Sequence, residues 1–551
     1  MEQRPWLMNY PSGVPANIDA DSYPNLLVFF EETFKKYQKK TAFVCMDKGL
    51  TFQTIDKMSS QFAAYLHSRG LEPGDKIALM MPNLLQYPIA LFGALRAGLI
   101  VVNTNPLYTP REMKHQFIDS GVKAILIAEN FAANLEKILA ETSIKVVITT
   151  SIGELLGFFK GGIVNFVVRR IKKMVPKYEI PNTVKFSEAI SQGSRFKIKE
   201  FTSKPEDTII LQYTGGTTGV SKGAMLTHRN LVANLLQVQA IMNPFLNKEG
   251  ATILCPLPLY HIYAFTVNCL ALMSMGARNI LITNPRDLGT LISAFKKYPI
   301  DLMTGLNTLF NALLNHKEFA GLDFSHLKIT SAGGMALQQS VAERWQEVTG
   351  CQISEGYGMT ETSPVACSNY PGGHARIGTI GLPVPSTDMR IVDEEGNVLP
   401  PNEVGEIQIK GPQVMKGYYN RPDETAKCLK DGWISTGDIG LMEDDGYFKI
   451  VDRKKDMILV SGFNVFPNEI EAVIAAHPKV LEVAAIGVPD EKSTEAVKVF
   501  IVKKDNSLTE GEIKEYCKEN LTGYKRPRHI EFRDELPKTN IGKILRRALK
   551  E

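Results

Sequence analysis

A loop rich in glycine and threonine, set between an apolar run and an amphipathic segment, constrains the fold of this chain more than any other feature. The loop reads Tyr213-Thr-Gly-Gly-Thr-Thr-Gly-Val-Ser-Lys-Gly223. The run Ile209-Ile-Leu211 before it is typical of a buried strand, and Thr227 after it is a favourable N-cap for a helix. Glycine lets backbone N–H groups approach an anion, and the hydroxyl and lysine side chains add donors. We therefore expect strand, phosphate loop and helix in succession.

The spacing within this loop differs from that of a P-loop NTPase. The stretch Gly219-Val-Ser-Lys222 lacks the Gly-Lys-Ser/Thr ending that holds a magnesium-bound triphosphate. We therefore expect another class of nucleotide site. A flexible surface loop is the alternative that composition alone leaves open.

Length and charge limit the classes of protein to consider. A chain of 551 residues is too long for one hydrophobic core, so we expect two or more domains. The 63 Lys and Arg residues nearly balance the 59 Asp and Glu residues, and a net charge of +4 does not indicate a nucleic-acid partner. The seven scattered cysteines indicate neither a disulfide framework nor a zinc site. Because the N-terminal stretch lacks a signal-peptide core and no apolar run reaches about 18 residues, we expect a cytoplasmic protein.

The pattern along the chain predicts an α/β protein. Short apolar runs alternate with helical patterns over residues 41–150 and again over 209–355, which is typical of mostly parallel sheets. Residues 375–451 change to short alternating strands broken by turns, which indicates a small β-barrel or β-sheet subdomain. We predict a large N-terminal domain over 1–452 and a small, mobile α+β C-terminal domain over 453–551.

The segment 155–177 is unusual because it carries six cations and no acidic residue. If a helix begins after Gly162, one face is apolar and the other is mainly basic, although Arg170 interrupts the apolar face. The apolar face would hold Ile163, Phe166, Val167, Ile171 and Met174. The basic face would hold Arg169, Lys172 and Lys173. Two interpretations stay open: contact of 160–177 with an anionic membrane surface, or a helix packed on its own domain with a solvated basic side.

Four further motifs carry groups that suit a nucleotide. They are Ser331-Ala-Gly-Gly-Met335, Glu355-Gly-Tyr-Gly-Met-Thr-Glu-Thr-Ser363, Asp431-Gly-Trp-Ile-Ser-Thr-Gly-Asp438 and Pro537-Lys-Thr-Asn-Ile-Gly-Lys-Ile-Leu-Arg-Arg547. Glycines after a strand let a planar base lie close to the backbone, Tyr357 can stack on a base, and Glu361 can hold Mg²⁺. Asp438 can accept hydrogen bonds from both ribose hydroxyls. Each motif alone is equally compatible with a surface turn or a solvated tail.

The order of these motifs resembles the ANL superfamily of adenylate-forming enzymes, which includes acyl-CoA synthetases, luciferases and the adenylation domains of peptide synthetases. Pro258-Leu-Tyr-His-Ile262 lies between the phosphate loop and the glycine turn, and Asp452-Arg-Lys-Lys-Asp456 follows Asp438. The stretch 431–455 is similar to the fatty-acyl-CoA synthetase signature. Within that group, three segments resemble the bacterial long-chain fatty-acid–CoA ligases of β-oxidation. These are Met81-Pro-Asn-Leu-Leu-Gln-Tyr-Pro88, Asn105-Pro-Leu-Tyr-Thr-Pro-Arg111 and the basic segment after residue 160.

The resemblance covers essentially the whole chain and implies a two-step ligation. A fatty-acid carboxylate attacks the α-phosphate of ATP to give acyl-AMP and pyrophosphate, and the thiol of coenzyme A then displaces AMP. Mg²⁺ is the implied cofactor, and ATP and coenzyme A are the implied co-substrates. The resemblance also implies a peripheral position at the inner face of the cytoplasmic membrane, and a homodimer is compatible with it.

The resemblance assigns roles to individual residues. Thr214 to Lys222 would wrap the β- and γ-phosphates, and Thr214 and Glu361 would contact Mg²⁺. The residues implied to bind ATP or coenzyme A are Tyr213, Thr214, Gly215, Gly216, Thr217, Thr218, Gly219, Lys222, Gly333, Gly334, Tyr357, Gly358, Thr360, Asp438, Arg453 and Gly462. The residues implied to be catalytic are Lys543, His261 and Glu361.

Several of these assignments specify a position on the substrate. Gly333 and Tyr357 would flank adenine, Thr360 would contact the α-phosphate, and Asp438 and Arg453 would hold the ribose. His261 would line the junction between the acyl tunnel and the reaction centre, although a satisfied core histidine is the alternative. Lys543 would bridge the carboxylate and the α-phosphate in the first step, because two anions must meet there. Gly462 would leave room for the arm of coenzyme A in the second step.

One position departs from the family pattern, and two other functions stay open. Phe265 stands where thermophilic relatives have a tryptophan that gates the acyl tunnel, so gating is expected to differ here. An acyl-AMP ligase that loads a carrier protein is the first alternative. A non-catalytic peripheral membrane protein that binds fatty acids is the second, and pyrophosphate release would separate it from an enzyme. The sequence does not indicate which chain length is preferred, because an acyl tunnel is lined by ordinary apolar residues.

Overall fold

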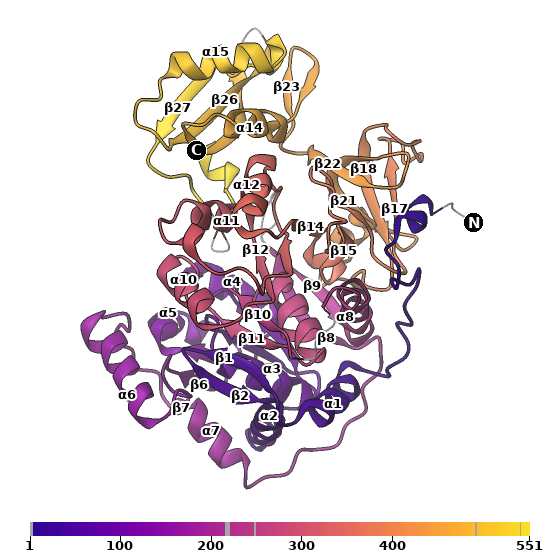
Figure 1. Ribbon diagram of the computed structural model, residues 1–551. Coiled ribbons are helices and arrows are strands. Elements are labelled where there is room, and N and C mark those ends of the chain that lie inside the picture. The colour runs from indigo at the N-terminus through magenta and orange to yellow at the C-terminus, as the bar shows by residue number, and fades with distance from the viewer. Residues whose placement is uncertain (1–3, 215–220, 247–249, 491–492, 540–541, 551) are drawn as a thin grey trace.

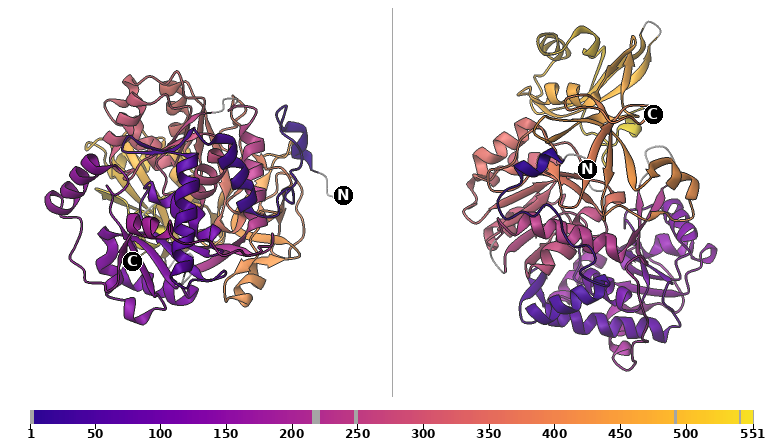
Figure 2. Two further views of the ribbon diagram at one scale, coloured as in Figure 1. Left: turned by 90° about the horizontal axis from the view of Figure 1, so that it is seen from below. Right: turned by 90° about the vertical axis from the view of Figure 1, so that its right-hand side faces the viewer.

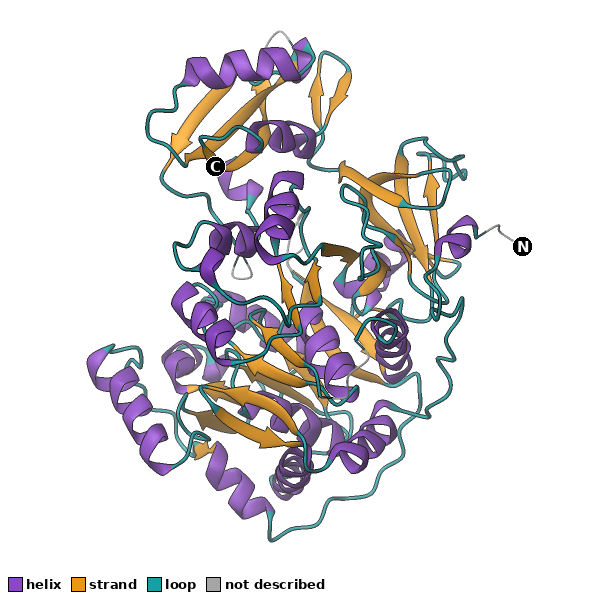
Figure 3. Cartoon of the chain, in the orientation of Figure 1, coloured by secondary structure: helices purple, strands orange, loops and turns teal. Residues whose placement is uncertain are grey.

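The computed structural model describes residues 4–214, 221–246, 250–490, 493–539 and 542–550. Figure 1 shows a large body that contains two sheets with helices around them, a smaller group of strands beside it, and a C-terminal unit above it. The side view in Figure 2 also places the C-terminal unit at one end of the molecule. In Figure 3 the smaller group is built mainly of strands, whereas helices surround the sheets of the large body. The fold is therefore the α/β architecture that the sequence predicts.

The first sheet of the large body has eight strands in the order β19-β9-β8-β4-β3-β5-β6-β7. Its strands are β3 (Lys76–Met80), β4 (Ile100–Asn103), β5 (Ala124–Ala128), β6 (Val146–Thr150), β7 (Val184–Lys185), β8 (Thr208–Thr214), β9 (Lys222–Thr227) and β19 (Gly417–Tyr418). The pairs from β8 to β7 are parallel, and β9 and β19 add an antiparallel edge. The strands predicted from the apolar runs near residues 76, 100, 124 and 146 are confirmed.

The second sheet has nine strands in the order β16-β15-β14-β13-β12-β10-β11-β1-β2. Its strands are β1 (Thr41–Cys45), β2 (Lys48–Thr51), β10 (Thr252–Cys255), β11 (Arg278–Leu281), β12 (Leu302–Gly305), β13 (Ile329–Ala332), β14 (Ile353–Gly358), β15 (Val365–Ser368) and β16 (Leu382–Pro383). The strands from β1 to β14 pair in parallel. Their carboxyl ends therefore share one edge, where ligands usually bind in sheets of this kind.

Helices cover the outer faces of these sheets, and a core joins the sheets to each other. The helices of the large body are α1 (Leu26–Tyr37), α2 (Phe52–Ser68), α3 (Gln86–Arg96), α4 (Pro110–Ser120), α5 (Ala132–Glu136), α6 (Phe158–Phe166), α7 (Phe186–Gly193), α8 (His228–Met242), α9 (Ile262–Ala264), α10 (Leu288–Lys297), α11 (Asn307–Leu314), α12 (Gln339–Thr349) and α13 (Pro422–Cys428). Along β3, Ile77 and Leu79 belong to the core shared by both sheets, whereas Ala78 and Met80 belong to a separate outer core. This alternation is the period of a strand that is buried on both faces.

The glycine-rich loop connects two antiparallel strands, which differs from the predicted order. Thr214 at the end of β8 pairs with Lys222 at the start of β9. The helix α8 begins only after β9, although Thr227 is its N-cap as expected. The prediction that a helix follows the loop directly is therefore wrong. The physical reason is that Ala224 and Leu226 are buried and extend the sheet by one strand.

Apart from β16 and β19, which extend the two sheets of the large body, the strands described in 375–451 form a separate antiparallel sheet, as the change of pattern predicts. They are β17 (Asp388–Val392), β18 (Gly405–Lys410), β20 (Leu429–Lys430), β21 (Trp433–Met442) and β22 (Phe448–Arg453). β22 leads into the C-terminal unit, and the proposed domain boundary between residues 452 and 453 falls within its last two residues.

The C-terminal unit is a five-stranded sheet with two helices. Its elements are β23 (Ile458–Val460), β24 (Phe463–Val465), α14 (Pro467–Ala475), β25 (Val480–Asp490), β26 (Thr494–Lys503), α15 (Glu510–Asn520) and β27 (His529–Arg533). This combination of strands and helices is the α+β architecture that the sequence predicts for 453–551. This unit has its own buried core around Ile470 and Val499, so it can move as one body.

The basic segment forms the helix α6, which continues as a π-helical stretch, η4 (Val167–Ile171), at the edge of the large body (Figure 1). The predicted start after Gly162 is wrong, because α6 begins at Phe158. Gly161 is needed for close packing: a Cβ there would lie 2.3 Å from the carbonyl oxygen of Gly153. Gly161 therefore allows two segments of the chain to pack closely, and Gly162 does not mark the start of the helix.

The outer face of α6 and η4 is apolar, which removes one of the two interpretations of this segment. The large apolar side chains that face solvent are Phe158, Phe159, Ile163, Phe166, Ile171 and Met174. Val168 is buried instead, and Arg169 forms a two-pronged pair with Glu129 at 2.7 and 2.9 Å. The interpretation that this helix packs its apolar face on its own domain is therefore wrong. Within the described ranges, no helix is both long and apolar enough to cross a membrane.

Candidate active site

A cavity of about 2140 Å³ brings together motifs from both ends of the chain. Its walls include the carboxyl ends of β13 and β14, part of β21, and the C-terminal segment that carries Lys543. The predicted site residues that line it are Tyr213, Thr214, Lys222, His261, Gly333, Gly334, Tyr357, Gly358, Thr360, Glu361, Asp438, Arg453 and Lys543. Residues far apart in the sequence therefore face one space, and their individual roles stay predictions.

Other predicted residues are not placed in this cavity. Gly215, Gly216, Thr217, Thr218 and Gly219 lie outside the described residues. Gly462 lies at the tip of the β23–β24 hairpin with a φ of 86°, and a Cβ there would meet no atom within 4 Å. Phe265 is fully buried at the start of η5 (Phe265–Leu272) and does not line the cavity. Its role as a tunnel gate stays a prediction.

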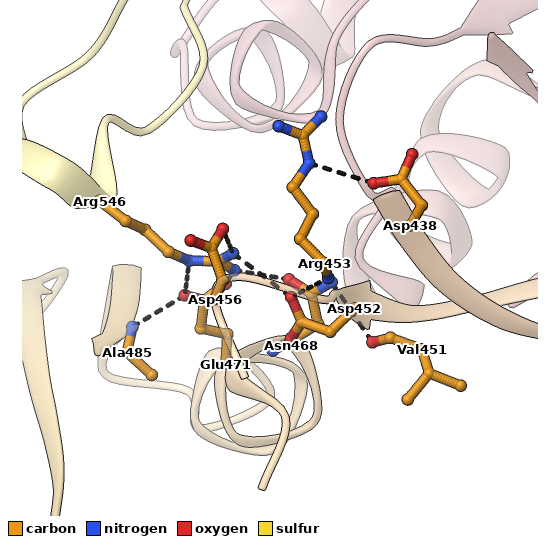
Figure 4. A network of polar contacts seen from close by, with 9 residues as sticks. All are labelled: Asp438, Val451, Asp452, Arg453, Asp456, Asn468, Glu471, Ala485 and Arg546. Atoms are coloured by element: carbon orange, nitrogen blue, oxygen red, sulfur yellow. Dashed lines mark hydrogen bonds and ion pairs between the residues drawn. The ribbon is translucent and has the colours of Figure 1, made fainter. Parts of the chain in front are cut away.

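One wall combines the glycine turn with an aromatic ring and a carboxylate. Gly334 follows β13 with a φ of 83°, a conformation that favours glycine. The hydroxyl of Tyr357 donates a hydrogen bond of 2.6 Å to Asp438 on β21. Arg453 lies opposite Asp438 in the β21–β22 register, and its Nε approaches the other carboxylate oxygen at 3.2 Å (Figure 4). This group offers a flat pocket beside a charged pair, which suits a base and a ribose.

A second wall carries the carboxylate predicted to hold a metal. Glu361 is buried, and burial raises the pKa of its carboxyl despite the hydrogen bond that Tyr418 donates at 2.6 Å. The ammonium of Lys222 lies 4.7 Å from the centre of the Tyr418 ring and forms an ion pair with Glu424 at 2.7 Å. A cation placed beside Glu361 would relieve the unfavourable burial of its charge.

The donor set fits Mg²⁺ bound mainly through substrate phosphates. Thr214 and Glu361 supply a hydroxyl and a carboxylate, which are oxygen ligands that Mg²⁺ accepts. In the described part of the chain, no cluster of three or more His, Cys, Asp or Glu side chains could hold an ion alone. Two protein ligands together with phosphate oxygens and water are the usual arrangement for this ion.

Lys543 enters the cavity from the C-terminal unit. Its Cε lies 3.9 Å from the position that a Cβ would take at Gly334. Burial, and after it the positive charge of Arg453, lower the pKa of Lys543 to about 8, while Asp438 opposes the shift. Thr308 of α11 donates a hydrogen bond of 3.1 Å to the carbonyl oxygen of Gly542, which fixes the segment at this point.

His261 lies near Lys543 and is neutral at pH 7. It caps α9, where its Nδ1 accepts a hydrogen bond from the backbone N–H of Tyr263 at 3.4 Å. Burial lowers the pKa of His261 to about 4, and the charge of Lys543 contributes to the shift. A neutral imidazole leaves Lys543 as the cation at this point of the cavity.

The cavity extends away from the charged wall into an apolar region. The apolar residues that line this part include Val238, Ile241, Met242, Ile262, Val267 and Ile380. These side chains come from α8, from α9 and η5, which are continuous, and from the segment before β16, so three separate parts of the chain line the cavity here. A long apolar chain attached to a polar head suits this combination of walls.

Three polar residues of the site were not predicted. Tyr418 and Glu424 contact predicted residues, but they follow a turn that carries no recognised motif. Glu355 lies beside the predicted Tyr357, and burial raises the pKa of its carboxyl to about 8 although it accepts a hydrogen bond from Leu337. The acidic position two residues before Tyr357 was the available signal for Glu355.

Comparison with known proteins gives consistent matches over the whole chain. Residues 30–419 match the family model described as AMP-binding enzyme, and residues 469–543 match the AMP-binding enzyme C-terminal domain. A long-chain-fatty-acid–CoA ligase of Escherichia coli O6:H1 is 54% identical over 547 residues, which is 99% of this chain and 98% of that protein. Its counterpart in Bacillus subtilis is 38% identical over 553 residues and covers 100% of this chain and 98% of its own.

Solved structures agree with the family match. The crystal structure of an anthranilate CoA ligase in complex with anthranoyl-AMP superimposes with a TM-score of 0.86 at 26% identity and covers 97% of this chain and 98% of its own. The family model alone covers more than half of the chain. The protein therefore belongs to the AMP-binding enzyme family, which is the adenylate-forming ANL group.

Proposed function

We propose that this protein ligates a long-chain fatty acid to coenzyme A through an acyl-AMP intermediate and releases AMP and pyrophosphate. Relatives at 54% and 38% identity over nearly the full chain are long-chain-fatty-acid–CoA ligases. The observation that carries the proposal is that Lys543 lines the same cavity as the nucleotide-wall residues and the apolar side chains, and approaches Gly334. A cation in this cavity would offset the repulsion between the carboxylate and the phosphate, two anions that must meet for the reaction.

In the first step, a carboxylate oxygen attacks the α-phosphorus of ATP and the bond to pyrophosphate breaks. Lys543 would sit between the carboxylate and the α-phosphate, where its charge offsets their repulsion. Asp438 and Arg453 would hold the ribose, while Gly333 and Tyr357 would flank the base. Because Asp438 is buried and already paired with Tyr357 and Arg453, little reorganisation is needed when charge develops.

Thr214 and Glu361 would hold Mg²⁺ together with the phosphates. When bound, the ion would neutralise charge on the phosphate oxygens and on the departing pyrophosphate. Lys222 would contribute a second cation on the same side, after exchange of its partner Glu424 for a phosphate.

In the second step, the thiol of coenzyme A attacks the acyl carbon and the bond to AMP breaks. Lys543 occupies the space beside that carbon in the present arrangement, so we infer that the C-terminal unit turns to admit the thiol. The hairpin that carries Gly462 is a candidate for the surface presented after the turn.

Product analysis tests the proposed function. Enzyme, ATP and Mg²⁺ are mixed with saturated acids from octanoate to stearate, with and without coenzyme A, and nucleotide and acyl products are separated. We expect AMP, pyrophosphate and acyl-CoA in equal amounts with the longer acids. Acyl-AMP that persists when coenzyme A is present would favour a ligase for a carrier protein. Absence of pyrophosphate with every acid would favour a binding protein and reject an enzyme.

We also propose that the outer face of α6 and η4 contacts an anionic lipid surface. The face joins exposed aromatic side chains to Arg170, Lys172 and Lys173, all of which face solvent. A second copy of this chain is a poorer occupant, because a two-fold contact would bring the same cations together. Lipid offers both an apolar layer and anionic head groups. The enzyme could then meet fatty acids where they partition.

A further inference from the structure

The segment that carries Lys543 is held by an arginine three residues later. Arg546 donates from Nε and Nη2 to the two carboxylate oxygens of Glu471 at 3.0 and 2.8 Å, and from Nη2 to Asn468 at 2.5 Å (Figure 4). Its Nη1 lies 3.4 Å from a carboxylate oxygen of Asp456. Arginine suits this position because its planar fork can serve several oxygens at once.

The same guanidinium lies near Asp452, at 3.7 Å from Nη1. Asp452 belongs by its backbone to the antiparallel sheet beside the large body, where it stands opposite Ile439. Its side chain is fully buried and accepts hydrogen bonds from the backbone N–H groups of Arg453 and Asn468, each at 2.7 Å. One carboxylate therefore joins the last strand of that sheet to the C-terminal unit.

These contacts form a continuous path from the nucleotide wall to the segment of Lys543. Asp438 pairs with Arg453, and Asp452 is the neighbour of Arg453 in β22. Asp452 in turn lies beside the guanidinium of Arg546, as the close-up in Figure 4 shows. The path crosses from the large part of the molecule to the C-terminal unit between residues 452 and 453.

Because the groups along this path are charged, the stability of the arrangement depends on whether these groups stay close to their partners. Burial raises the pKa of Asp452 to about 6, and the charge of Arg546 opposes that shift. Burial alone would lower the pKa of Arg546, but the carboxylates of Glu471, Asp452 and Asp456 outweigh it and raise the pKa. A buried charge that loses its partner is strongly unfavourable, so these contacts stabilise only arrangements that keep them together.

We propose that Arg546 is a positioning residue that holds Lys543 in the arrangement for the first half-reaction by tying its segment to Asp452. This inference rests on the proposed function. A turn of the C-terminal unit about residues 452 and 453 moves Asn468, Glu471 and Arg546 as one body relative to the backbone of Asp452. The contacts made by the Asp452 side chain would then break, whereas those between Arg546 and Glu471 would persist. Arg546 therefore favours adenylation over the later thiol attack.

The alternative is a purely structural role for Arg546 within the C-terminal unit. Its contacts with Glu471 and Asn468 lie inside that unit and would support the fold in every arrangement. A structural role predicts equal loss of both half-reactions, because a loosened unit serves neither. The two half-reactions therefore separate the two roles.

The test compares Arg546→Gln with Arg528→Gln, an exposed arginine of the C-terminal unit that does not line the cavity. The first half-reaction is measured as pyrophosphate released from ATP and palmitate without coenzyme A. The second is measured as acyl-CoA formed from supplied palmitoyl-AMP and coenzyme A. For R546Q we expect the first rate to fall about tenfold or more and the second to stay within about twofold of wild type. R528Q should leave both rates within about twofold of wild type. Arg546→Lys should recover part of the first rate, because it restores the charge without the planar fork.

A coupled variant shows whether Asp452 is the partner. Asp452→Asn keeps the shape of the side chain and removes its charge, so it should also slow the first half-reaction selectively. The double variant D452N/R546Q should be no slower than R546Q alone, because both changes remove one contact. If R546Q fails to fold by circular dichroism, D452N alone carries the test.

Three outcomes would overturn the inference. An unchanged first rate in folded R546Q, or equal loss of both rates, would return Arg546 to a structural role. Additive losses in the double variant would show that Asp452 and Arg546 act separately. Absence of pyrophosphate release by the wild-type enzyme would instead reject the proposed function, and this inference with it.

Discussion

The surroundings of Lys543 disfavour its positive charge, and the pH dependence of the enzyme should reflect this. Burial and Arg453 lower its pKa to about 8, so it loses its proton at a lower pH than a solvated lysine. Adenylation needs the ammonium form. The first half-reaction should therefore be at full rate below about pH 7 and decline as pH rises through about 8.

The pH profile of pyrophosphate release in single turnover, from about pH 6.5 to about pH 9.5, measures this directly. Lys543→Arg supplies the control, because arginine stays charged over the whole range and should lose the alkaline decline whatever its residual rate. A wild-type rate that stays constant to the alkaline end of the range would contradict the assignment of Lys543.

Glu361 should be required for the use of Mg²⁺. Glu361→Gln keeps the hydrogen bond from Tyr418 but removes the charge that would face the ion, so turnover should fall by roughly two orders of magnitude. A titration of rate against Mg²⁺ concentration checks this, with Glu395→Gln, an exposed turn residue, as the control. Near-normal turnover of Glu361→Gln at ordinary Mg²⁺ concentration would remove Glu361 from the metal site.

Single residues of the site could be predicted where a motif contains them. Tyr357, Glu361 and Asp438 lie in short glycine-containing motifs, and the structure brings them to one cavity. Tyr418 and Glu424 could not be predicted, because their partners lie 57 and 202 residues away along the chain. A contact of that kind depends on the tertiary fold and leaves no local pattern.

At the scale of elements, periodicity predicted the strands and most helices but not what each element contacts. The helix α6 was predicted to be amphipathic, yet its start and the direction of its apolar face depend on the packing of Gly161 against Gly153. The strand β9 was not predicted for a related reason. Thr227 indicates where α8 begins, but it does not indicate that a strand lies between the loop and this cap. Local sequence signals identify a helix cap or a turn. Tertiary contacts decide whether a strand or a loop precedes that cap.

The outer face of α6 should bind lipid by insertion as well as by charge. Replacing Phe158 and Phe159 by serine should weaken binding to anionic vesicles at both low and high salt, because apolar burial is not screened. Replacing Lys172 and Lys173 by glutamine should weaken binding mainly at low salt, at about 1 kcal/mol for each cation. Vesicle sedimentation at two salt concentrations measures both effects, with Val398→Ser as an exposed apolar control. Equal binding by all variants would show that this face does not contact lipid.

At the scale of the whole molecule, the sequence predicted two units but not how they meet. Lys543 and Gly334 lie in different family-matched segments, and only the folded arrangement shows that they are neighbours. The hydrogen bonds between Thr308 and Gly542, and between Asn311 and Leu481, hold the C-terminal unit against α11.

This arrangement predicts opposite effects of two substitutions on the two half-reactions. Lys543→Ala should nearly abolish acyl-AMP formation while supplied acyl-AMP still reacts with coenzyme A. Gly462→Leu should do the reverse, because it adds a side chain to the hairpin where a φ of 86° also disfavours any residue but glycine. Rates of both half-reactions in folded variants check the pair. Equal losses in Lys543→Ala would contradict two arrangements of the C-terminal unit.

The central claim is that the cavity joins a fatty acid to AMP before coenzyme A takes part. Rapid quenching of enzyme mixed with ATP labelled at the α-phosphate, Mg²⁺ and palmitate, without coenzyme A, tests it most directly. The account predicts one labelled palmitoyl-AMP for each active site, equal pyrophosphate, and transfer of the acyl group to coenzyme A when it is then added. Formation of ADP and phosphate, or of no labelled acyl product until coenzyme A is present, would contradict it.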